Sequence, residues 1–281
     1  MHYTNYHTHT SFCDGADVPA NYCKTALLKG ITSLGFSAHA PLPFPCKWTL
    51  PLNRFNEYIS NIEILKQEFD GKIEIYCGLE IDYIPALWET IKSQYNFSRL
   101  NYLIGSIHFI DAFADGSPWT IDGSNDEFRK GFREVFDNNS HAVIRKYFQY
   151  TREMIDVVQP KIIGHIDKIK MQHNGDCLVP ETDVVYRDEI FKTLEKIASS
   201  GNIVEINTRG VYRRNESDFY PSFWIIQEMA RLKIPVMVNS DAHRPEELTK
   251  LWDTAHAQLK KAGYKDVIML HKGEWVPQKI S

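Results

Sequence analysis

The sequence has 281 residues, of which 43% are hydrophobic and 24% are charged, a composition typical of a folded globular protein with a large core. Its 32 basic and 36 acidic residues give a net charge of −4, so it lacks the basic field of nucleic-acid-binding proteins. Its apolar runs are shorter than the roughly 20 residues that span a bilayer, and its polar amino terminus is unlike a secretory signal. We expect a cytoplasmic protein with neither a nucleic-acid nor a membrane partner.

Short β-branched and apolar runs alternate along the chain with longer amphipathic runs. The short runs predict strands at residues 3–9, 31–37, 73–80, 102–108, 162–167, 203–208 and 235–241. A shorter eighth candidate covers residues 267–271. The longer runs predict helices at about residues 18–29, 55–69, 85–95, 142–158, 188–199, 222–232 and 246–262. Strand–helix–strand alternation repeated this often implies parallel pairing, in either an open doubly wound α/β sheet or a closed barrel.

Two segments fit this alternation poorly. Residues 110–140 are rich in Asp, Gly, Ser and Asn with scattered aromatic residues, and residues 41–53 contain four prolines. Long connections between regular elements often form lids or binding loops. We predict that both segments are loops at a substrate-facing rim.

The five cysteines are irregularly spaced, and the sequence has no Cys-x-x-Cys motif. An extracellular disulfide framework normally uses an even number of cysteines in a shorter chain. We therefore predict five reduced thiols, several of them buried.

Six of the eleven histidines stand at or just past the C-terminal ends of predicted strands, namely His7, His9, His39, His108, His165 and His243. Glu80 and Asp241 occupy the same kind of position. In a parallel barrel these ends open onto one face, where catalytic residues gather. A lone histidine on a strand is more often structural than functional. The joint pattern of imidazoles and carboxylates, however, is the ligand inventory of a metal site.

The spacing of these residues favours more than one ion. His7 and His9 are two residues apart on one strand, so both rings project to the same face, and Asp241 and His243 repeat this spacing. With Asp14 there are nine candidate ligands, whereas one tetrahedral zinc needs about four. Two or three clustered ions can stabilise both the attacking and the leaving oxygen of a phosphoryl displacement and can activate water. The pattern predicts hydrolysis of a phosphate ester.

Seven stretches resemble, in order, the motifs of the PHP (polymerase and histidinol phosphatase) superfamily. They are residues 7–13 (HTHTSFC), 35–41 (GFSAHAP), 78–80 (GLE), 105–109 (GSIHF), 164–167 (GHID), 205–208 (EINT) and 239–243 (NSDAH). Each motif is weak by itself, but seven in the order of the family are a strong signal. Within the superfamily, the chain is most similar to the monofunctional histidinol-phosphate phosphatases.

The resemblance implies one domain over residues 1–281, a distorted seven-stranded β/α barrel that binds three divalent ions, which would be zinc, manganese or iron. For the first ion it implies the ligands His7, His9, Glu80 and Asp241. For the second ion, bridged to the first by Glu80, it implies the ligands His108 and His165.

Two positions depart from the family pattern at the third ion. Its implied ligands are His39, His243 and a residue soon after Cys13, where these phosphatases commonly have histidine. Here Asp14 is our candidate and Asp17 is the alternative; a carboxylate makes the site harder and changes its metal preference. The family also often has aspartate in place of Ala38, a neighbour that would orient His39.

The resemblance further implies a phosphomonoesterase of histidine biosynthesis that converts L-histidinol phosphate to L-histidinol and phosphate. A metal-bridging hydroxide would attack phosphorus, and Asp241 and His243 are candidates for protonating the leaving group. Arg209 and Arg213 follow the predicted strand 203–208 and would bind the phosphate through their guanidinium groups. The alternative for each arginine is a solvated surface side chain.

Three other functions stay open at this point. Another small phosphate ester would suit the same site. An amidohydrolase-type barrel also begins with His-x-His, although Glu80 and the pair Asp241 and His243 argue against cleavage of C–N bonds. A metal-stabilised interaction module, such as the PHP domains inside DNA polymerases, is a third possibility, against which the retained ligands argue.

Overall fold

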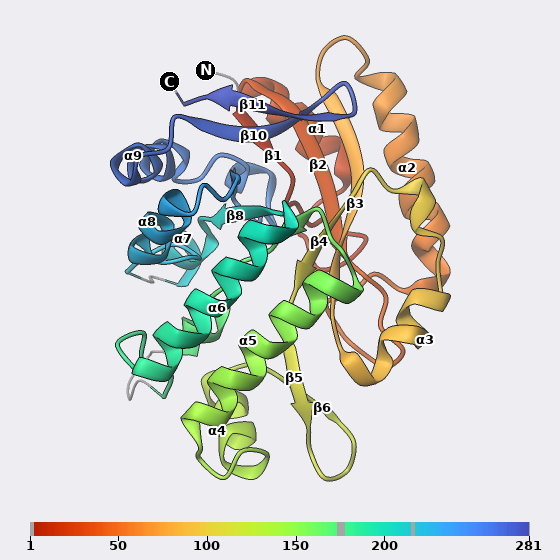
Figure 1. Ribbon diagram of the computed structural model, residues 1–281. Helices are drawn as coiled ribbons and strands as arrows, with labels where there is room; N and C mark the ends of the chain where they lie inside the picture. Colours follow the sequence, from red (N-terminus) through yellow and green to blue (C-terminus); the bar gives the residue numbers. More distant parts are fainter. Residues whose placement is uncertain (1–2, 173–177, 215–216, 281) are drawn as a thin grey trace.

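A computed structural model describes residues 3–172, 178–214 and 217–280. Seven parallel strands form one sheet in the order β1-β2-β3-β4-β7-β8-β9 (Figure 1). These strands are β1 (Tyr3–Asn5), β2 (Ile31–His39), β3 (Glu74–Asp82), β4 (Tyr102–Ser106), β7 (Ile162–Ile163), β8 (Ile203–Asn207) and β9 (Val236–Asn239). All seven lie within, or within two residues of, the ranges expected from the sequence.

The sheet nearly closes into a barrel through backbone contacts between its first and last strands. Past the end of β1, Thr8 forms a parallel bridge with Ala242, which lies past the end of β9. The His9 amide donates to the Ala242 carbonyl at 2.8 Å, and the Ala242 amide donates to the His7 carbonyl at 3.1 Å. These few bonds replace a regular strand pair, so the barrel is distorted. Of the two α/β architectures expected, the structure therefore adopts the barrel.

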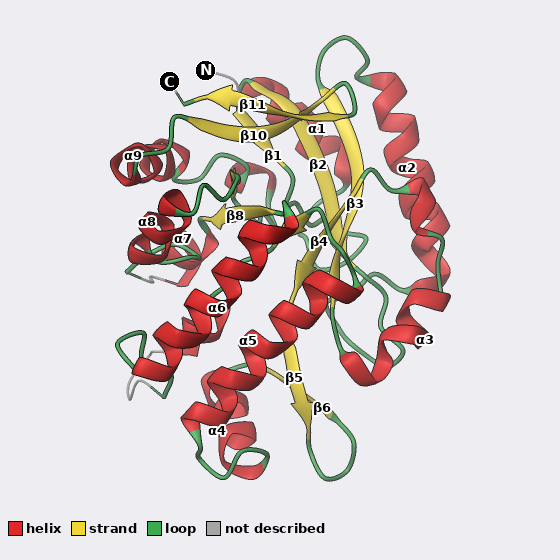
Figure 2. Ribbon diagram, in the orientation of Figure 1, coloured by secondary structure: helices red, strands yellow, loops and turns green. Residues whose placement is uncertain are grey.

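Helices cover the outside of the barrel (Figure 2). They are α1 (Pro19–Leu28), α2 (Phe55–Glu68), α3 (Trp88–Ser93), α5 (Ser140–Val157), α6 (Val184–Ser200), α8 (Phe223–Arg231) and α9 (Trp252–Ala262). Their buried residues recur every three or four positions, as Val143, Tyr147, Thr151 and Met154 do on α5, which is the period of a helix with one buried face. Asn139 accepts a hydrogen bond from the Ala142 amide and so caps α5, because the first amides of a helix need an acceptor.

Three helices differ from their sequence prediction, and the eighth candidate strand is confirmed. The helix expected at residues 188–199 begins four residues earlier, at Val184. The helix expected at residues 85–95 is a 3-10 turn (Pro85–Leu87) followed by the short α3. The helix expected at residues 246–262 begins only at Trp252. The eighth candidate strand forms β10 (Asp266–His271), which pairs antiparallel with β11 (Glu274–Lys279) outside the barrel sheet.

Tyrosine rings fill the N-terminal end of the barrel interior. Tyr102 is buried and donates its hydroxyl hydrogen to the Tyr6 carbonyl at 2.6 Å. Its ring lies against Gly35 and Gly78, where an added Cβ would stand 2.3 Å and 2.5 Å from ring or hydroxyl atoms. The β10–β11 hairpin covers this end, since the Leu270 amide donates to the Tyr6 hydroxyl at 2.7 Å. The tyrosines and the hairpin together close the end of the barrel opposite the predicted site.

The segment at residues 110–140 is not the long loop that we expected. It contains most of an antiparallel hairpin, β5 (Phe109–Ala112) and β6 (Pro118–Thr120), and the helix α4 (Asn125–Glu134). Ser124 and Glu127 form a capping box at the start of α4, a signal that is visible in the sequence as Ser-x-x-Glu. The sequence also gave no indication of the short helix α7 (Arg209–Arg214). Residues 41–51 have no helix or strand, as expected.

Two further expectations concern the cysteines and the absence of membrane-spanning helices among the described residues. Cys13, Cys23, Cys46 and Cys77 are free thiols, and Cys23 and Cys77 are buried, while Cys177 lies outside the described residues. Among the described helices, none combines the length and the apolar character needed to cross a membrane.

Candidate metal centre

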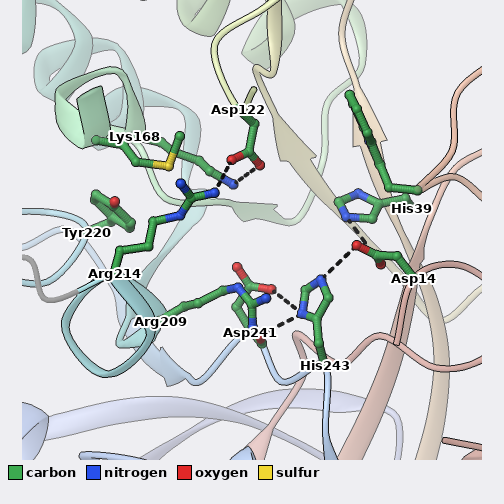
Figure 3. A pocket seen from close by; sticks show the side chains of 12 residues that line it. Asp14, His39, Asp122, Lys168, Arg209, Arg214, Tyr220, Asp241 and His243 are labelled. Carbon is green, nitrogen blue, oxygen red and sulfur yellow. Dashed lines mark hydrogen bonds and ion pairs between the residues drawn. The ribbon is translucent and has the colours of Figure 1, made fainter. Parts of the chain in front are cut away.

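The nine predicted ligands gather where the barrel strands end, and four of them, Asp14, His39, Asp241 and His243, line a cavity of about 180 Å³ (Figure 3). They come from segments that are far apart in the chain: the ends of β1, β2, β3, β4, β7 and β9, and the turn before α1. Parallel strands place their carboxyl ends on one face of a barrel. This arrangement accounts for the convergence of side chains separated by more than 200 residues.

The first group of ligands joins the first and last strands of the barrel. His7 Nε2 lies 3.1 Å from Glu80 Oε2 and 3.7 Å from Asp241 Oδ1. His9 Nε2 lies 3.3 Å from Asp241 Oδ1 and 3.5 Å from Glu80 Oε2. Ligand atoms of His7, His9 and Asp241 all lie within 4.8 Å of one another, close enough to hold one ion.

Glu80 stands between this group and a second one. Its Oε1 lies 3.0 Å from His165 Nε2 and 3.8 Å from His108 Nε2, while its Oε2 faces His7 and also lies 2.9 Å from His39 Nδ1. A carboxylate whose two oxygens face different imidazole groups is suited to bridge two cations.

The third group consists of Asp14, His39 and His243, again with His9 nearby. Asp14 Oδ2 lies 3.1 Å from His243 Nε2, and Asp14 Oδ1 lies 3.9 Å from His39 Nε2. Asp17, the alternative ligand, instead accepts hydrogen bonds from the Val18 amide and the Asn21 side chain at the start of α1. The structure therefore brings Asp14 to the cluster and not Asp17.

Several ligand atoms are buried without a hydrogen bond. These atoms are His7 Nε2, His9 Nε2, His39 Nδ1, Glu80 Oε2 and Asp241 Oδ1. A buried polar atom that makes no hydrogen bond costs about 1–3 kcal/mol, and here such atoms face a shared space. Bound cations would satisfy them together, and a set of imidazole nitrogens and carboxylate oxygens suits zinc, manganese or iron. The residues present therefore fit the metal cluster that the sequence predicts.

Two further carboxylates orient the imidazole rings. Glu205 Oε2 lies 2.9 Å from His7 Nδ1, and Asp82 Oδ1 lies 2.8 Å from His108 Nδ1. Each therefore accepts a hydrogen bond from Nδ1–H and leaves Nε2 free to face the cluster. Neither residue was predicted from the sequence to have a role in the site, although Asp82 follows Glu80 by two positions on β3 and so shares its face.

Asp241 is held in an unusual backbone conformation, with a φ of +51°. Non-glycine residues in this left-handed region are strained, and they persist where the surroundings fix them. Arg209 Nη1 donates to the Asp241 carbonyl at 2.9 Å, and the Asn207 side chain donates to Asp241 Oδ2 at 3.2 Å. These contacts fix the turn that carries both Asp241 and His243.

The carboxylates of the cluster stay ionised in spite of their burial. Burial raises the pKa of Glu80, but His7, His39 and His108 outweigh it and bring the pKa well below its ordinary value. The pKa of Asp241 is also lowered well below its ordinary value, because His7 and His9 outweigh the effect of burial. The site therefore presents negative charge to an approaching cation.

The imidazole pKa values diverge within the cluster. Burial lowers the pKa of His7, but Glu205 and Glu80 outweigh it and raise the pKa well above its ordinary value. Burial together with the neighbouring His39 and His243 brings the pKa of His9 well below its ordinary value. A neutral imidazole such as that of His9 is the form that binds a metal.

Three cationic side chains line the cavity, namely Lys168, Arg209 and Arg214 (Figure 3). Arg213, which we expected to face it, is exposed and does not line it; the next residue, Arg214, does. Lys168 and its partner Asp122 were not singled out from the sequence. Asp122 lies in the segment first interpreted as a loop, and Lys168 follows the stretch GHID.

Ala38, the second departure from the family pattern, packs into the hydrophobic layer outside the barrel. It is the residue before His39 on β2, and neighbours on a strand project to opposite faces. The His39 ring stacks on His9 with the ring centres 4.2 Å apart.

Comparison with known proteins agrees with this geometry. The family model described as PHP domain matches residues 5–209. A "Probable histidinol-phosphatase" from Deinococcus radiodurans is 28% identical over 269 residues, which cover 95% of this chain and 96% of that protein. The histidinol-phosphatase of Bacillus subtilis is 29% identical over 255 residues, which cover 85% of this chain and 92% of that one.

A solved structure shares the fold. The histidinol phosphate phosphatase of Lactococcus lactis, in complex with zinc, L-histidinol and phosphate, aligns with a TM-score of 0.71 and 22% identity, covering 97% of this chain and 98% of that one. The predicted barrel is thereby confirmed. Since the family model covers well over half of the sequence, the chain belongs to the PHP domain family.

Proposed function

We propose that this protein is a metal-dependent phosphomonoesterase that hydrolyses L-histidinol phosphate to L-histidinol and phosphate. The observation that carries the proposal is the convergence of nine metal-ligand side chains, several with buried atoms that make no hydrogen bond, at one end of a PHP barrel, where four of them line a cavity. Relatives that are named histidinol-phosphatase and align over 85% or more of the chain support the choice of substrate.

The proposed cluster holds three divalent ions. The ligands of the first are His7, His9, Glu80 and Asp241; those of the second are Glu80, His108 and His165; those of the third are Asp14, His39 and His243. The short distances within each group support this division. Zinc is the first candidate, because it accompanies product and phosphate in the Lactococcus lactis structure.

When bound, such ions activate water at neutral pH and stabilise charge on the phosphate oxygens. The protein's own contribution is positional. Glu205 and Asp82 fix the tautomers of His7 and His108, and Arg209 holds the Asp241 turn while its guanidinium group lines the cavity. We assign Arg209 to phosphate binding. Asp241 and His243 also line the cavity and are our candidates for protonating the leaving oxygen. Because the Asp241 carboxylate is ionised, it would do so with a proton that it first accepts from the attacking water.

A phosphate-release screen tests the proposal. The metal-replete protein, prepared separately with zinc, manganese and iron, would be offered histidinol phosphate beside a panel of other small phosphate esters. We expect histidinol phosphate to give the highest kcat/KM. A strong preference for another ester would refute histidinol phosphate as the substrate but would still support phosphatase activity. Release of ammonia from amide substrates without phosphate release would indicate an amidohydrolase, and bound metal without any hydrolysis would indicate a structural module.

A further inference from the structure

A buried ammonium group lies at the edge of the candidate metal cluster. Lys168 follows β7 in a 3-10 turn (Lys168–Gln172), and its side chain is only 9% exposed. Its Nζ lies 3.2 Å from His108 Nε2, the ring nitrogen that faces the cluster. It also lies 2.7 Å from Asp122 Oδ2. Figure 3 shows the Lys168 and Asp122 side chains meeting at the wall of the cavity across from Asp14 and His39.

Structural stability alone does not explain a lysine at this place. Removing an ammonium group and a carboxylate from water costs several kcal/mol per ion, and apolar residues of similar volume often serve a fold as well or better. An ammonium group has three donor hydrogens. Asp122 engages one of them and His108 Nε2 lies within hydrogen-bond distance of a second. Because Lys168 lines the cavity, the third has access to a ligand oxygen.

The other cations of the cavity are less available. Arg209 Nη1 donates to the Asp241 carbonyl at 2.9 Å and lies 3.5 Å from Glu247 Oε2, so part of its guanidinium group is used to hold the turn. Arg214 is 40% exposed and its Nη2 pairs with Asp122 Oδ1 at 2.9 Å. Of the three, Lys168 is the most buried, and its Nζ lies 3.2 Å from the ring nitrogen of a candidate metal ligand, His108.

We propose that Lys168 binds the phosphate group of the substrate, and that Asp122 is the positioning residue that holds its ammonium group against the metal cluster. The proposal rests on the proposed function, because it takes a phosphate ester as the ligand. Lys168 and Arg209 would then supply positive charge to the phosphate dianion from two separate segments of the chain. Desolvated, charge-assisted hydrogen bonds of this kind are stronger than those at a surface.

Asp122 also explains why the segment between β5 and α5 matters for the site. It lies between β6 and α4 and contacts Lys168 and Arg214, which come from two other parts of the barrel rim. The segment thereby supplies the one carboxylate among the cavity-lining residues that we do not assign to a metal. Its single negative charge offsets part of the positive charge of these two side chains in the absence of substrate.

Replacing Lys168 with methionine tests the proposal, since it removes the charge and nearly keeps the volume. In the metal-replete protein we expect kcat/KM for the phosphate ester to fall at least about tenfold, and inhibition by inorganic phosphate to weaken by a similar factor, as loss of one charge-assisted hydrogen bond predicts. Lys168→Arg should retain part of the phosphate inhibition. The bound metal, counted by elemental analysis, should stay the same. Lys192→Met is the matched control, because it removes an exposed lysine on α6 that pairs with Asp188 and Glu189 and does not line the cavity.

A double-mutant cycle tests the positioning role of Asp122. Asp122→Asn should weaken phosphate inhibition when Lys168 is present and should have little further effect in the Lys168→Met background. Equal effects of Asp122→Asn in both backgrounds would show a role independent of Lys168 and refute the positioning role. If Lys168→Met does not fold, weaker inhibition in Asp122→Asn and retained inhibition in Lys168→Arg still test the proposal.

Two outcomes would overturn the role of Lys168. One is unchanged inhibition by inorganic phosphate in Lys168→Met. The other is a gain of one bound ion in that variant, which would mean that the ammonium group occupies the place of a cation beside His108. A failure of the proposed function is distinguishable from a failure of the role of Lys168. In that case the unmodified protein would hydrolyse none of the phosphate esters in the phosphate-release screen. Preference for a different ester would leave the phosphate-inhibition test valid.

Discussion

At the scale of single residues, the candidate site depends on which atom of each side chain faces the cavity. A metal ligand must present an unprotonated donor, and the tautomer of a histidine is fixed by the partner of its other nitrogen. Glu205 fixes His7 and Asp82 fixes His108 in this way. The chemistry of the site therefore extends to carboxylates that would not touch an ion themselves.

Asp241→Asn and His9→Ala should each abolish turnover while the fold survives. Both residues lie in the first ligand group, where His9 Nε2 is 3.3 Å from Asp241 Oδ1, and asparagine keeps the shape of aspartate without its charge. Turnover with histidinol phosphate, circular dichroism and metal content together check this. Near-wild-type activity of either variant in a metal-replete assay would contradict the ligand assignment.

Asp82→Asn should weaken metal binding or activity by about 10–100-fold, the usual effect of removing a carboxylate that orients a ligating histidine. The loss follows because the neutral amide oxygen of asparagine is a weaker acceptor for the His108 Nδ1 hydrogen than the carboxylate oxygen that now lies 2.8 Å from Nδ1. Competition with a metal chelator measures the affinity. Asp70→Asn, an exposed change on the loop before β3, is the control. If the Asp82→Asn protein binds metal as tightly as this control, Asp82 does not orient His108 for metal binding.

The buried thiols give a prediction about pH. Burial raises the pKa of Cys23 to about 12 and that of Cys77 to about 12. A raised pKa keeps the thiol protonated at pH 8, and only the thiolate reacts with alkylating agents. Both cysteines should therefore resist iodoacetamide between pH 7 and about pH 9 in the native protein and react fully in denaturant, as peptide mass spectrometry would show. Rapid native labelling of either would contradict their burial.

At the scale of elements, the barrel depends on close contacts that the strand pattern does not reveal. Gly35 on β2 and Gly78 on β3 leave space for the ring of Tyr102, which projects from β4 into the barrel. Similarly, the segment after β4 folds into a hairpin and a capped helix. Its polar composition resembles that of a loop, because α4 buries only Phe128, Gly131 and Phe132.

Gly78→Ala should destabilise the protein by about 1–3 kcal/mol, the usual cost of overpacking. The added methyl group would stand 2.5 Å from Tyr102 Cζ, and the tyrosine cannot move away without losing its hydrogen bond to the Tyr6 carbonyl. Urea unfolding measures the change in the free energy of unfolding. A stability equal to that of the unmodified protein would show that the ring has room to shift.

At the scale of the whole molecule, the metal site lies across the seam of the barrel. The first and last strands are joined by the bridge between Thr8 and Ala242, and the candidate ligands next to that bridge, His7, His9, Asp241 and His243, come from both sides of it. Ions bound there would connect the ends of the first and last strands, where regular strand pairing is missing. Binding of a ligand to the native state alone stabilises it, by about 4 kcal/mol at a thousand times Kd.

Removal of metal by a chelator should therefore lower the Tm by several degrees and increase hydrogen exchange at residues 7–9 and 241–243 more than in α5 or α6. Calorimetry and exchange measured by mass spectrometry check both parts, and restoring the metal should reverse them. A Tm that does not change after complete removal of metal would show that the cluster does not stabilise the seam.

The sequence by itself determined the alternation of strands and helices, the barrel class and the set of side chains at the strand ends. These features depend on local periodicity and short motifs, so they can be predicted without the three-dimensional structure. Only the tertiary structure decided that Asp14 and not Asp17 reaches the cluster, that Arg214 and not Arg213 lines the cavity, and that Lys168 meets Asp122. Such pairings join segments tens to hundreds of residues apart, and their geometry follows from how helices and loops pack on the barrel, which no local pattern records.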